Sequence, residues 1–164
     1  MMSAVRSSIG RIAVLAGLLL LAAGIGSVSA ASCSGSSCAG KNPQTMGCSS
    51  DAVTKGNVYS QGILTVEIRY SRACDAWWAR VTCDGSPNPQ LAVYVSFIQF
   101  VNGAQSSKQR LAGDHAAACY TGETTWTYMI ADRSSGDHYN ACWQYGIWGT
   151  EETPTESDYC VGRI

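Results

Sequence analysis

Charged residues are scarce in this chain, at 14% of the sequence against about a quarter in an average soluble domain. No long polar or repetitive tract accounts for the shortage, so the composition does not indicate intrinsic disorder. Basic residues are not in excess either, because 11 Lys and Arg face 12 Asp and Glu. A nucleic-acid-binding domain usually carries a basic surface. We therefore expect an ordered domain and no nucleic-acid partner.

An apolar run long enough to span a membrane is also missing. Residues 12–25 are uncharged, but a transmembrane helix needs about 20 apolar residues. Two arginines precede this run and small residues follow it, an order typical of a secretory signal peptide with cleavage after Ala30. We therefore predict a signal peptide at residues 1–30, a single exported domain at residues 31–164, and no membrane span.

A lipoprotein signal is the alternative for this terminus. The segment from Ala30 to Cys33 loosely fits the pattern in which Cys33 becomes a lipidated first residue. However, Ala30 stands where leucine is usual, and lipidation would leave an odd number of cysteines in an exported protein. We therefore favour a secreted, extracellular protein over one anchored through Cys33.

All eight cysteines lie after the predicted cleavage site. An exported chain meets oxidising conditions, and the even number predicts four disulfides whose pairing the sequence does not select. The closest pairs lack the two-residue spacing of a zinc site, so we predict no cofactor. The predicted disulfide cysteines are Cys33, Cys38, Cys48, Cys74, Cys83, Cys119, Cys142 and Cys160.

Alternating apolar and polar residues predict strands rather than helices. The alternation is clearest at residues 64–70 and 77–82, and aromatic alternating segments follow at 124–130 and 141–148. Residues 91–101 are apolar on both faces, as expected of a strand between two packed layers. The predicted fold class is all-β, a small disulfide-braced antiparallel β-sandwich or barrel.

Both histidines lie in a repeated pattern, R-x-x-G-D-H-x-x-A-C followed by an aromatic residue. Imidazole and carboxylate groups can bind a divalent cation, so these Asp-His pairs are weak metal candidates. Gly-Asp is also ordinary turn chemistry, and adjacent strand residues point to opposite faces. We therefore interpret the repeat as structural and predict no metal site. The two pairs are Asp114 with His115 and Asp137 with His138.

Complete catalytic motifs are absent from the sequence. It contains no G-x-S-x-G, no H-E-x-x-H and no glycine-rich phosphate loop, so we assign no catalytic residue and favour a non-catalytic role. Aromatic residues offer another route to function, because exposed rings can stack on sugars or anchor a protein. Trp77 and Trp78 are adjacent in a predicted strand, so we expect one of them to lie nearer the surface.

Residues 38–80 resemble the YjfA-like family of exported bacterial proteins, a domain of unknown function. Asn42 stands where that family more often has Asp. The resemblance implies an exported, disulfide-containing, small β-rich domain, and it brings no established activity. The matching residues are Gly40-Lys41, Pro43, Gly47-Cys48, Asp51-Ala52, the segment from Val66 to Ser71, Cys74, and Trp78-Ala79-Arg80.

The matched segment contains the candidate binding residues. Glu67 and Arg69 share a strand face, and Arg80 lies on the following strand, where it could pair with them. One interpretation is a structural cross-strand charge cluster, worth about 0.2 to 1 kcal/mol per pair. The other is a recognition patch for a polar ligand, to which Trp78 would add an aromatic surface.

The sequence therefore predicts a secreted, non-catalytic binding or structural domain whose partner is an extracellular glycan or protein. Two alternatives stay open. One is a small secreted hydrolase acting on carbohydrate or cell-wall material, with carboxylates or Asp-His pairs as catalysts. The other is a secreted protein inhibitor, since disulfide-braced loops are a suitable scaffold for one.

Overall fold

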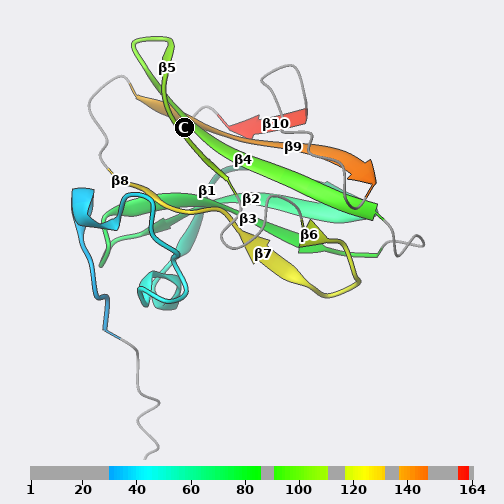
Figure 1. The fold of residues 1–164 in the computed structure, drawn as a ribbon, viewed down its shortest axis with the longest axis horizontal. Helices are drawn as coiled ribbons and strands as arrows, with labels where there is room; N and C mark the ends of the chain where they lie inside the picture. The colour runs from blue at the N-terminus through cyan, green and yellow to red at the C-terminus, as the bar shows by residue number, and fades with distance from the viewer. Residues whose placement is uncertain (1–29, 86–90, 111–116, 132–136, 148–158, 163–164) are drawn as a thin grey trace, which may run out of the picture.

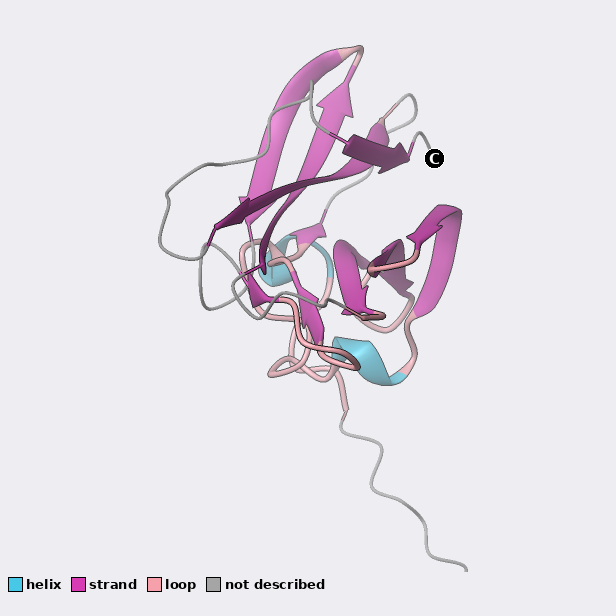
Figure 2. Cartoon of the chain, turned by 90° about the vertical axis from the view of Figure 1, so that its right-hand side faces the viewer, coloured by secondary structure: helices cyan, strands magenta, loops and turns pink. Residues whose placement is uncertain are grey.

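The structure is a computed structural model that describes residues 30–85, 91–110, 117–131, 137–147 and 159–162. Two antiparallel sheets face each other, and two short 3-10 helices lie beside the first sheet (Figure 1, Figure 2). The predicted all-β class is confirmed, and the sheets form a sandwich that does not close into a barrel. No helix in the described ranges is long and apolar enough to cross a membrane.

Each sheet has a row of four strands with one short strand beside it. The first sheet has the order β1-β2-β3-β7, with β8 also paired to β3, and the second has the order β10-β9-β4-β5, with β6 also paired to β4. The first sheet contains β1 (Val53–Gln61), β2 (Leu64–Ser71), β3 (Ala76–Cys83), β7 (Thr124–Trp126) and β8 (Ile130–Ala131). The second contains β4 (Leu91–Val101), β5 (Ala104–Arg110), β6 (Ala117–Ala118), β9 (His138–Ile147) and β10 (Tyr159–Gly162).

The strands predicted at residues 64–70, 77–82 and 91–101 correspond to β2, β3 and β4, and the one predicted at 141–148 corresponds to β9 up to residue 147, since residue 148 lies outside the described ranges. The single strand predicted at 124–130 is wrong, because the chain forms β7 and β8 with a break between them. Within the break, the Thr127 hydroxyl accepts a hydrogen bond from the Ala79 amide at 3.1 Å. The Met129 amide donates to the carbonyl of Lys41 at 3.0 Å, so the chain turns away from β3 toward the amino-terminal segment.

The core lies between the inner faces of the two sheets. Alternation along β2 and β3 points one set of apolar side chains inward, and β4 and β9 supply the opposing set. A row of four aromatic rings crosses this interface. Tyr70 contacts Trp77 at a centroid distance of 4.5 Å, and Tyr139 stacks on Trp77 at 5.1 Å and on Phe97 at 5.3 Å.

Residues 30–52, which we call the N-terminal layer, cover one end of the outer face of the first sheet. The layer contains the 3-10 helices η1 (Gly35–Cys38) and η2 (Cys48–Ser50). It forms a small second core around Trp78, with Met129 and Ala131 completing the contacts from the β7–β8 region. This layer lies outside the sandwich, so the first sheet is buried on both faces at this end.

All eight cysteines are paired, as predicted. Cys142 and Cys160 lie directly opposite each other on β9 and β10, so their disulfide joins neighbouring strands. The remaining disulfides are Cys33–Cys38, Cys48–Cys74 and Cys83–Cys119. Cys48–Cys74 therefore fastens the N-terminal layer to the connection between β2 and β3, whereas Cys33–Cys38 closes a loop within the layer.

Candidate functional site

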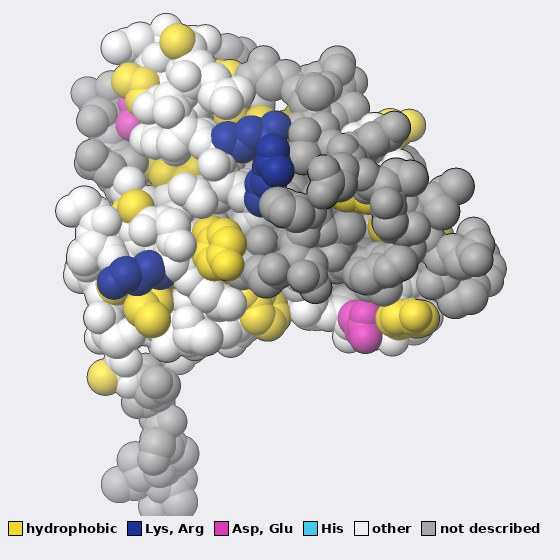
Figure 3. Space-filling model, viewed as in Figure 1, with side chains coloured by type: hydrophobic (Ala, Val, Ile, Leu, Met, Phe, Trp, Pro, Cys, Tyr) yellow, Lys and Arg dark blue, Asp and Glu magenta, His cyan; other side chains and the backbone are white. Residues whose placement is uncertain are grey.

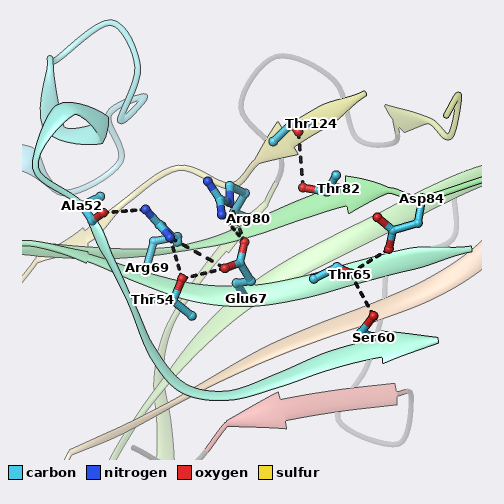
Figure 4. A network of polar contacts seen from close by, with 10 residues as sticks. All are labelled: Ala52, Thr54, Ser60, Thr65, Glu67, Arg69, Arg80, Thr82, Asp84 and Thr124. Atoms are coloured by element: carbon cyan, nitrogen blue, oxygen red, sulfur yellow. Dashed lines mark hydrogen bonds and ion pairs between the residues drawn. The ribbon is translucent and has the colours of Figure 1, made fainter. Parts of the chain in front are cut away.

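The candidate site lies on the outer face of the first sheet, beside the N-terminal layer. The strand register places Glu67 of β2 directly opposite Arg80 of β3, and Arg69 opposite Thr54 of β1. Directly opposite residues point to the same face, so all four side chains rise together from the sheet (Figure 4). The predicted grouping of Glu67, Arg69 and Arg80 is thus present in the structure.

Glu67 is the centre of a network of charged hydrogen bonds. Its Oε1 accepts from the Thr54 hydroxyl at 2.6 Å, and its Oε2 accepts from Arg80 Nε at 2.6 Å and also contacts Arg80 Nη2. Arg69 Nη1 lies 3.7 Å from Oε1. Only 12% of the Glu67 side chain is exposed, and each of its oxygens has a donor.

Arg69 is held by the amino-terminal end of β1. Its Nη1 donates to the Thr54 hydroxyl and its Nη2 to the carbonyl of Ala52, each at 2.5 Å. These bonds fix the guanidinium against the end of the N-terminal layer, where it is mostly buried. Arg69 therefore has the contacts of a structural residue within the site.

The charges of the cluster shift two pKa values. Burial alone would raise the pKa of Glu67, but the hydrogen bonds from Thr54 and Arg80 and the two positive charges outweigh it and lower this pKa from its ordinary value of 4.5. Burial and the nearby Arg80 charge lower the pKa of Arg69. One carboxylate against two guanidinium groups leaves one positive charge unbalanced in the cluster.

Arg80 is the part of the cluster that meets solvent. Its side chain is 35% exposed, although Glu67 holds it on one side. In Figure 4 one guanidinium nitrogen of Arg80 points away from Glu67. Trp126 of β7 lies directly opposite Arg80 and is half-buried, and its indole Nε1 donates to Asn42 Oδ1 at 2.9 Å. The guanidinium and the indole are therefore neighbours whose positions are both fixed.

A row of hydroxyl side chains continues from the charge cluster along the same face. Thr65 donates to Asp84 at 2.7 Å and contacts Ser60 at 3.2 Å, and Thr82 and Thr124 share a hydrogen bond of 3.3 Å (Figure 4). These hydroxyl residues were not among the predicted site residues. The alternation in residues 64–70 and 77–82 contained the signal for Thr65 and Thr82, because each is two positions from a charged candidate on the same face.

Trp78 has a different position from the one predicted. It is 2% exposed and belongs to the small core under the N-terminal layer, while Trp77 is 5% exposed and points into the sandwich. The two indoles do point to opposite faces, but the expectation that one lies near the surface is wrong. The reason is that the N-terminal layer covers the outer face just where Trp78 emerges.

The structure describes only one of the two Asp-His pairs named in the sequence analysis. Asp114 and His115 lie outside the described ranges. Asp137 is buried and accepts a hydrogen bond from Gln99 Nε2 at 3.1 Å, whereas His138 stacks on Phe100 at a centroid distance of 4.7 Å. Asp137 also lines a cavity of about 240 Å³ next to β5 and β8.

Figure 3 shows another side of the molecule, in the orientation of Figure 1. The basic side chains visible there occur in separate groups, and the hydrophobic atoms form small, separate spots. The described part of this side thus presents neither a continuous basic surface nor a broad apolar one.

The comparisons with known proteins identify a family. A family model described as Protein of unknown function (DUF2690) matches residues 36–142, which is more than half of the chain. The chain belongs to this family. The match includes the charge cluster, Trp126 and the Cys48–Cys74 disulfide that fastens the N-terminal layer. No curated protein and no solved structure matches the chain.

Proposed function

We propose that the chain is an exported, extracellular, non-catalytic binding domain that recognises an acidic glycan through the outer face of its first sheet. Four disulfides support an oxidising location, and the predicted signal peptide at residues 1–30 and the resemblance to the YjfA-like family support export.

The observation that carries the proposal is the position of Arg80. Glu67 holds its guanidinium in one orientation, the other side is exposed, and the ring of Trp126 stands directly across the strand pair. A guanidinium recognises a carboxylate through paired hydrogen bonds, and an indole packs against the apolar face of a sugar ring. Because Arg80 is already ordered, binding would cost less side-chain entropy.

The hydroxyl row gives the proposed site its length. Thr65, Thr82 and Thr124 extend from the Arg80 position along adjacent strands, and hydroxyl groups can donate to and accept from the hydroxyls of a sugar. A ligand that uses both parts needs a carboxylate at one point and neutral polar groups beyond it. A polymer of uronic acids has this chemistry, whereas a neutral glucan lacks the carboxylate.

The test is affinity electrophoresis of the oxidised protein in gels containing polygalacturonate, with dextran as the neutral comparison. We expect the wild-type protein to be retarded by polygalacturonate alone, and Arg80→Gln to weaken this binding about tenfold or more, because a charged hydrogen-bonding group is lost. Lys55→Gln is the matched control. It removes the same charge from an exposed position on β1, outside the cluster, and should retain most of the affinity.

Two results would contradict this function. The first is equal migration of the wild-type protein in both gels. The second is equal loss of affinity in Arg80→Gln and Lys55→Gln, which would indicate nonspecific attraction between charges. Release of reducing ends from polygalacturonate during incubation would show that the protein cleaves this polymer. The hydrolase alternative would then take the place of the non-catalytic binding function.

A further inference from the structure

The inner face of the second sheet changes from apolar to polar at one end. Along β4, Val95 and Phe97 point into the core, and Gln99 is the next residue on the same face. Gln99 is only 7% exposed, and so is Asp137, which directly precedes β9. Burying a polar side chain is costly unless it is hydrogen-bonded, so apolar packing between the sheets does not account for these residues.

The cavity of about 240 Å³ lies in front of these polar side chains. It is formed where β5 and β8, which belong to opposite sheets, lie near each other. Two of its lining residues, Ala39 of the N-terminal layer and Ser106 of β5, are exposed, so the cavity reaches the surface between them. Its polar lining residues are Gln99, Ser106, Ser107, Gln109 and Asp137.

The polar wall of the cavity has a fixed geometry. The side-chain amide of Gln99 is held from both ends, because its Nε2 donates to Asp137 Oδ2 at 3.1 Å and its Oε1 accepts from the Ser107 hydroxyl at 3.0 Å. The Tyr128 amide donates to the carbonyl of Arg110 at 2.9 Å, which joins the end of β5 to the break before β8. Binding to groups that are already oriented costs less side-chain entropy.

We propose that this cavity binds one neutral monosaccharide unit. Carboxamides and hydroxyls both donate and accept, and a carboxylate accepts up to about four hydrogen bonds, so the polar wall suits a ligand rich in hydroxyl groups. Val101, Ile130 and Ala131 supply an apolar wall for the C–H groups of a sugar ring. An apolar cavity of about 150 Å³ holds benzene, so this larger one has room for a single pyranose ring.

Charge should make the cavity selective for neutral sugars. Asp137 carries the only ionisable side chain among the described residues that line it. The carboxylate of an acidic sugar would lie near the carboxylate of Asp137, and like charges placed close together are strongly unfavourable. This selectivity is opposite to that proposed for the charge cluster. The cavity also uses other strands, so the inference does not depend on the proposed function.

The experiment is a titration of the oxidised, ¹⁵N-labelled full chain, followed by ¹H–¹⁵N NMR spectra. The probes are D-glucose, D-galactose and D-mannose, each compared with the uronate of the same ring configuration. We expect at least one hexose to produce saturable shifts in the residues that line the cavity. The matching uronate should bind about tenfold or more weakly, because of its charge.

Three variants locate the binding. Val101→Phe fills the cavity without changing its charge and should weaken hexose binding about tenfold or more. Val53→Phe is the matched control, because it makes the same change at a position on β1 that is 48% exposed, and it should retain the affinity. Asp137→Asn keeps the shape of the side chain and removes its charge. It should abolish most of the discrimination between hexose and uronate, even if it lowers both affinities.

Four results would overturn the proposal. The first is the absence of saturable shifts with all three hexoses, as expected of a cavity that holds only water. The others are equal binding of hexose and uronate by the wild-type protein, equal losses in Val101→Phe and Val53→Phe, and full discrimination in Asp137→Asn. If Val101→Phe does not fold, the discrimination measured in Asp137→Asn decides. Polygalacturonate plays no part in these titrations, so failure here and failure of the proposed function are distinguishable.

Discussion

The outer face of β2 and β3 differs sharply between its two ends. At one end Trp78 emerges beneath the N-terminal layer and packs against four cysteines and Met129. At the other end Thr65 and Thr82 emerge into a hydrogen-bonded polar surface. Both ends follow the same strand alternation, so the alternation decides which way a side chain points but not whether it is covered.

The covered end derives its burial from a distant part of the chain. Residues 30–52 are attached here by the Cys48–Cys74 disulfide and by backbone hydrogen bonds to Cys74 and to Met129. The open end is stabilised by polar contacts between its own strands. Changes at the covered end should therefore cost much more free energy of unfolding than changes at the open end.

Trp78→Ala should have the largest effect. It removes a buried indole and leaves a cavity beneath the N-terminal layer, which should lower the free energy of unfolding by about 3 to 5 kcal/mol. Thr82→Ala, on the same face of the same strand, should cost less than about 1 kcal/mol. Urea unfolding under oxidising conditions measures both. Equal losses would show that the layer does not stabilise this end.

The two disulfides of the layer should contribute unequally. Cys48–Cys74 closes a loop with a sequence separation of 26 and Cys33–Cys38 one of only 5. Restriction of the unfolded chain then predicts losses of about 3.5 and about 2 kcal/mol when each pair is replaced by alanine. Urea midpoints of the two double variants give the order. A larger loss for the Cys33–Cys38 replacement would mean that native contacts, not loop length, dominate.

Glu67→Gln tests the open end and should cost about 1 to 2 kcal/mol at neutral pH, because two guanidinium groups lose their shared carboxylate. The loss should depend on pH. The lowered pKa of Glu67 means that its ionised form stabilises the fold fully above the ordinary value of 4.5, and that this contribution disappears as the pH falls through the folded-state pKa.

The measurement is urea unfolding of the wild-type protein and Glu67→Gln at about pH 6 and about pH 3. We expect the wild-type protein to lose more stability on acidification than the variant. The variant should still lose some, because hydrogen bonds from Ser71 and Ala73 outweigh the effect of burial and lower the pKa of Asp51 as well. Identical acid losses in the two proteins would exclude Glu67 as a source of the pH dependence.

Asn42 of the N-terminal layer accepts a hydrogen bond from Trp126, which lies opposite Arg80 of the charge cluster. Its replacement should have the smallest effect on stability. Its Oδ1 accepts hydrogen bonds from the Gln44 amide at 2.8 Å and from Trp126 Nε1 at 2.9 Å. Asn42→Ala should therefore cost about 1 kcal/mol. Asn42→Asp should be nearly neutral, because a carboxylate oxygen accepts the same bonds. Thermal unfolding separates the variants, and a loss in Asn42→Asp equal to that in Asn42→Ala would contradict this role.

The fold was predictable where one face of a strand is apolar. Residues 64–70 and 77–82 show the alternation of β2 and β3, and the even cysteine count predicts four disulfides. Strand β1 was missed because its sequence is polar and its pairing with β2 is irregular between Lys55 and Tyr59, where Gly56 has a positive φ of 72°.

Strand β5 was also missed, although its turn carries a usable signal. Asn102 and Gly103 have φ values of 51° and 82°, which is the backbone of a two-residue hairpin, and Asn-Gly is the sequence that favours it. The polar strand after the turn gave no alternation to reinforce that signal. A search for this dipeptide after residues 91–101 would have found the β4–β5 hairpin.

The candidate site was predictable in part. Same-face spacing grouped Glu67 with Arg69, and the next strand supplied Arg80. Thr54 could not be added without β1, and the burial of Trp78 could not be foreseen because its cover comes from residues far away in the sequence. The cavity next to β5 and β8 was hidden for the same reason, since its walls come from parts of the chain that are distant in sequence.

The row of aromatic rings in the core gives the protein an internal optical signal. Tyr70 and Trp77 belong to the first sheet and Phe97 and Tyr139 to the second, so the row is complete only when the sheets are in contact. Fixed, closely spaced rings produce near-UV circular dichroism, which disappears when packing is lost even if the strands persist. Sheet-to-sheet closure can therefore be followed in solution without any attached label.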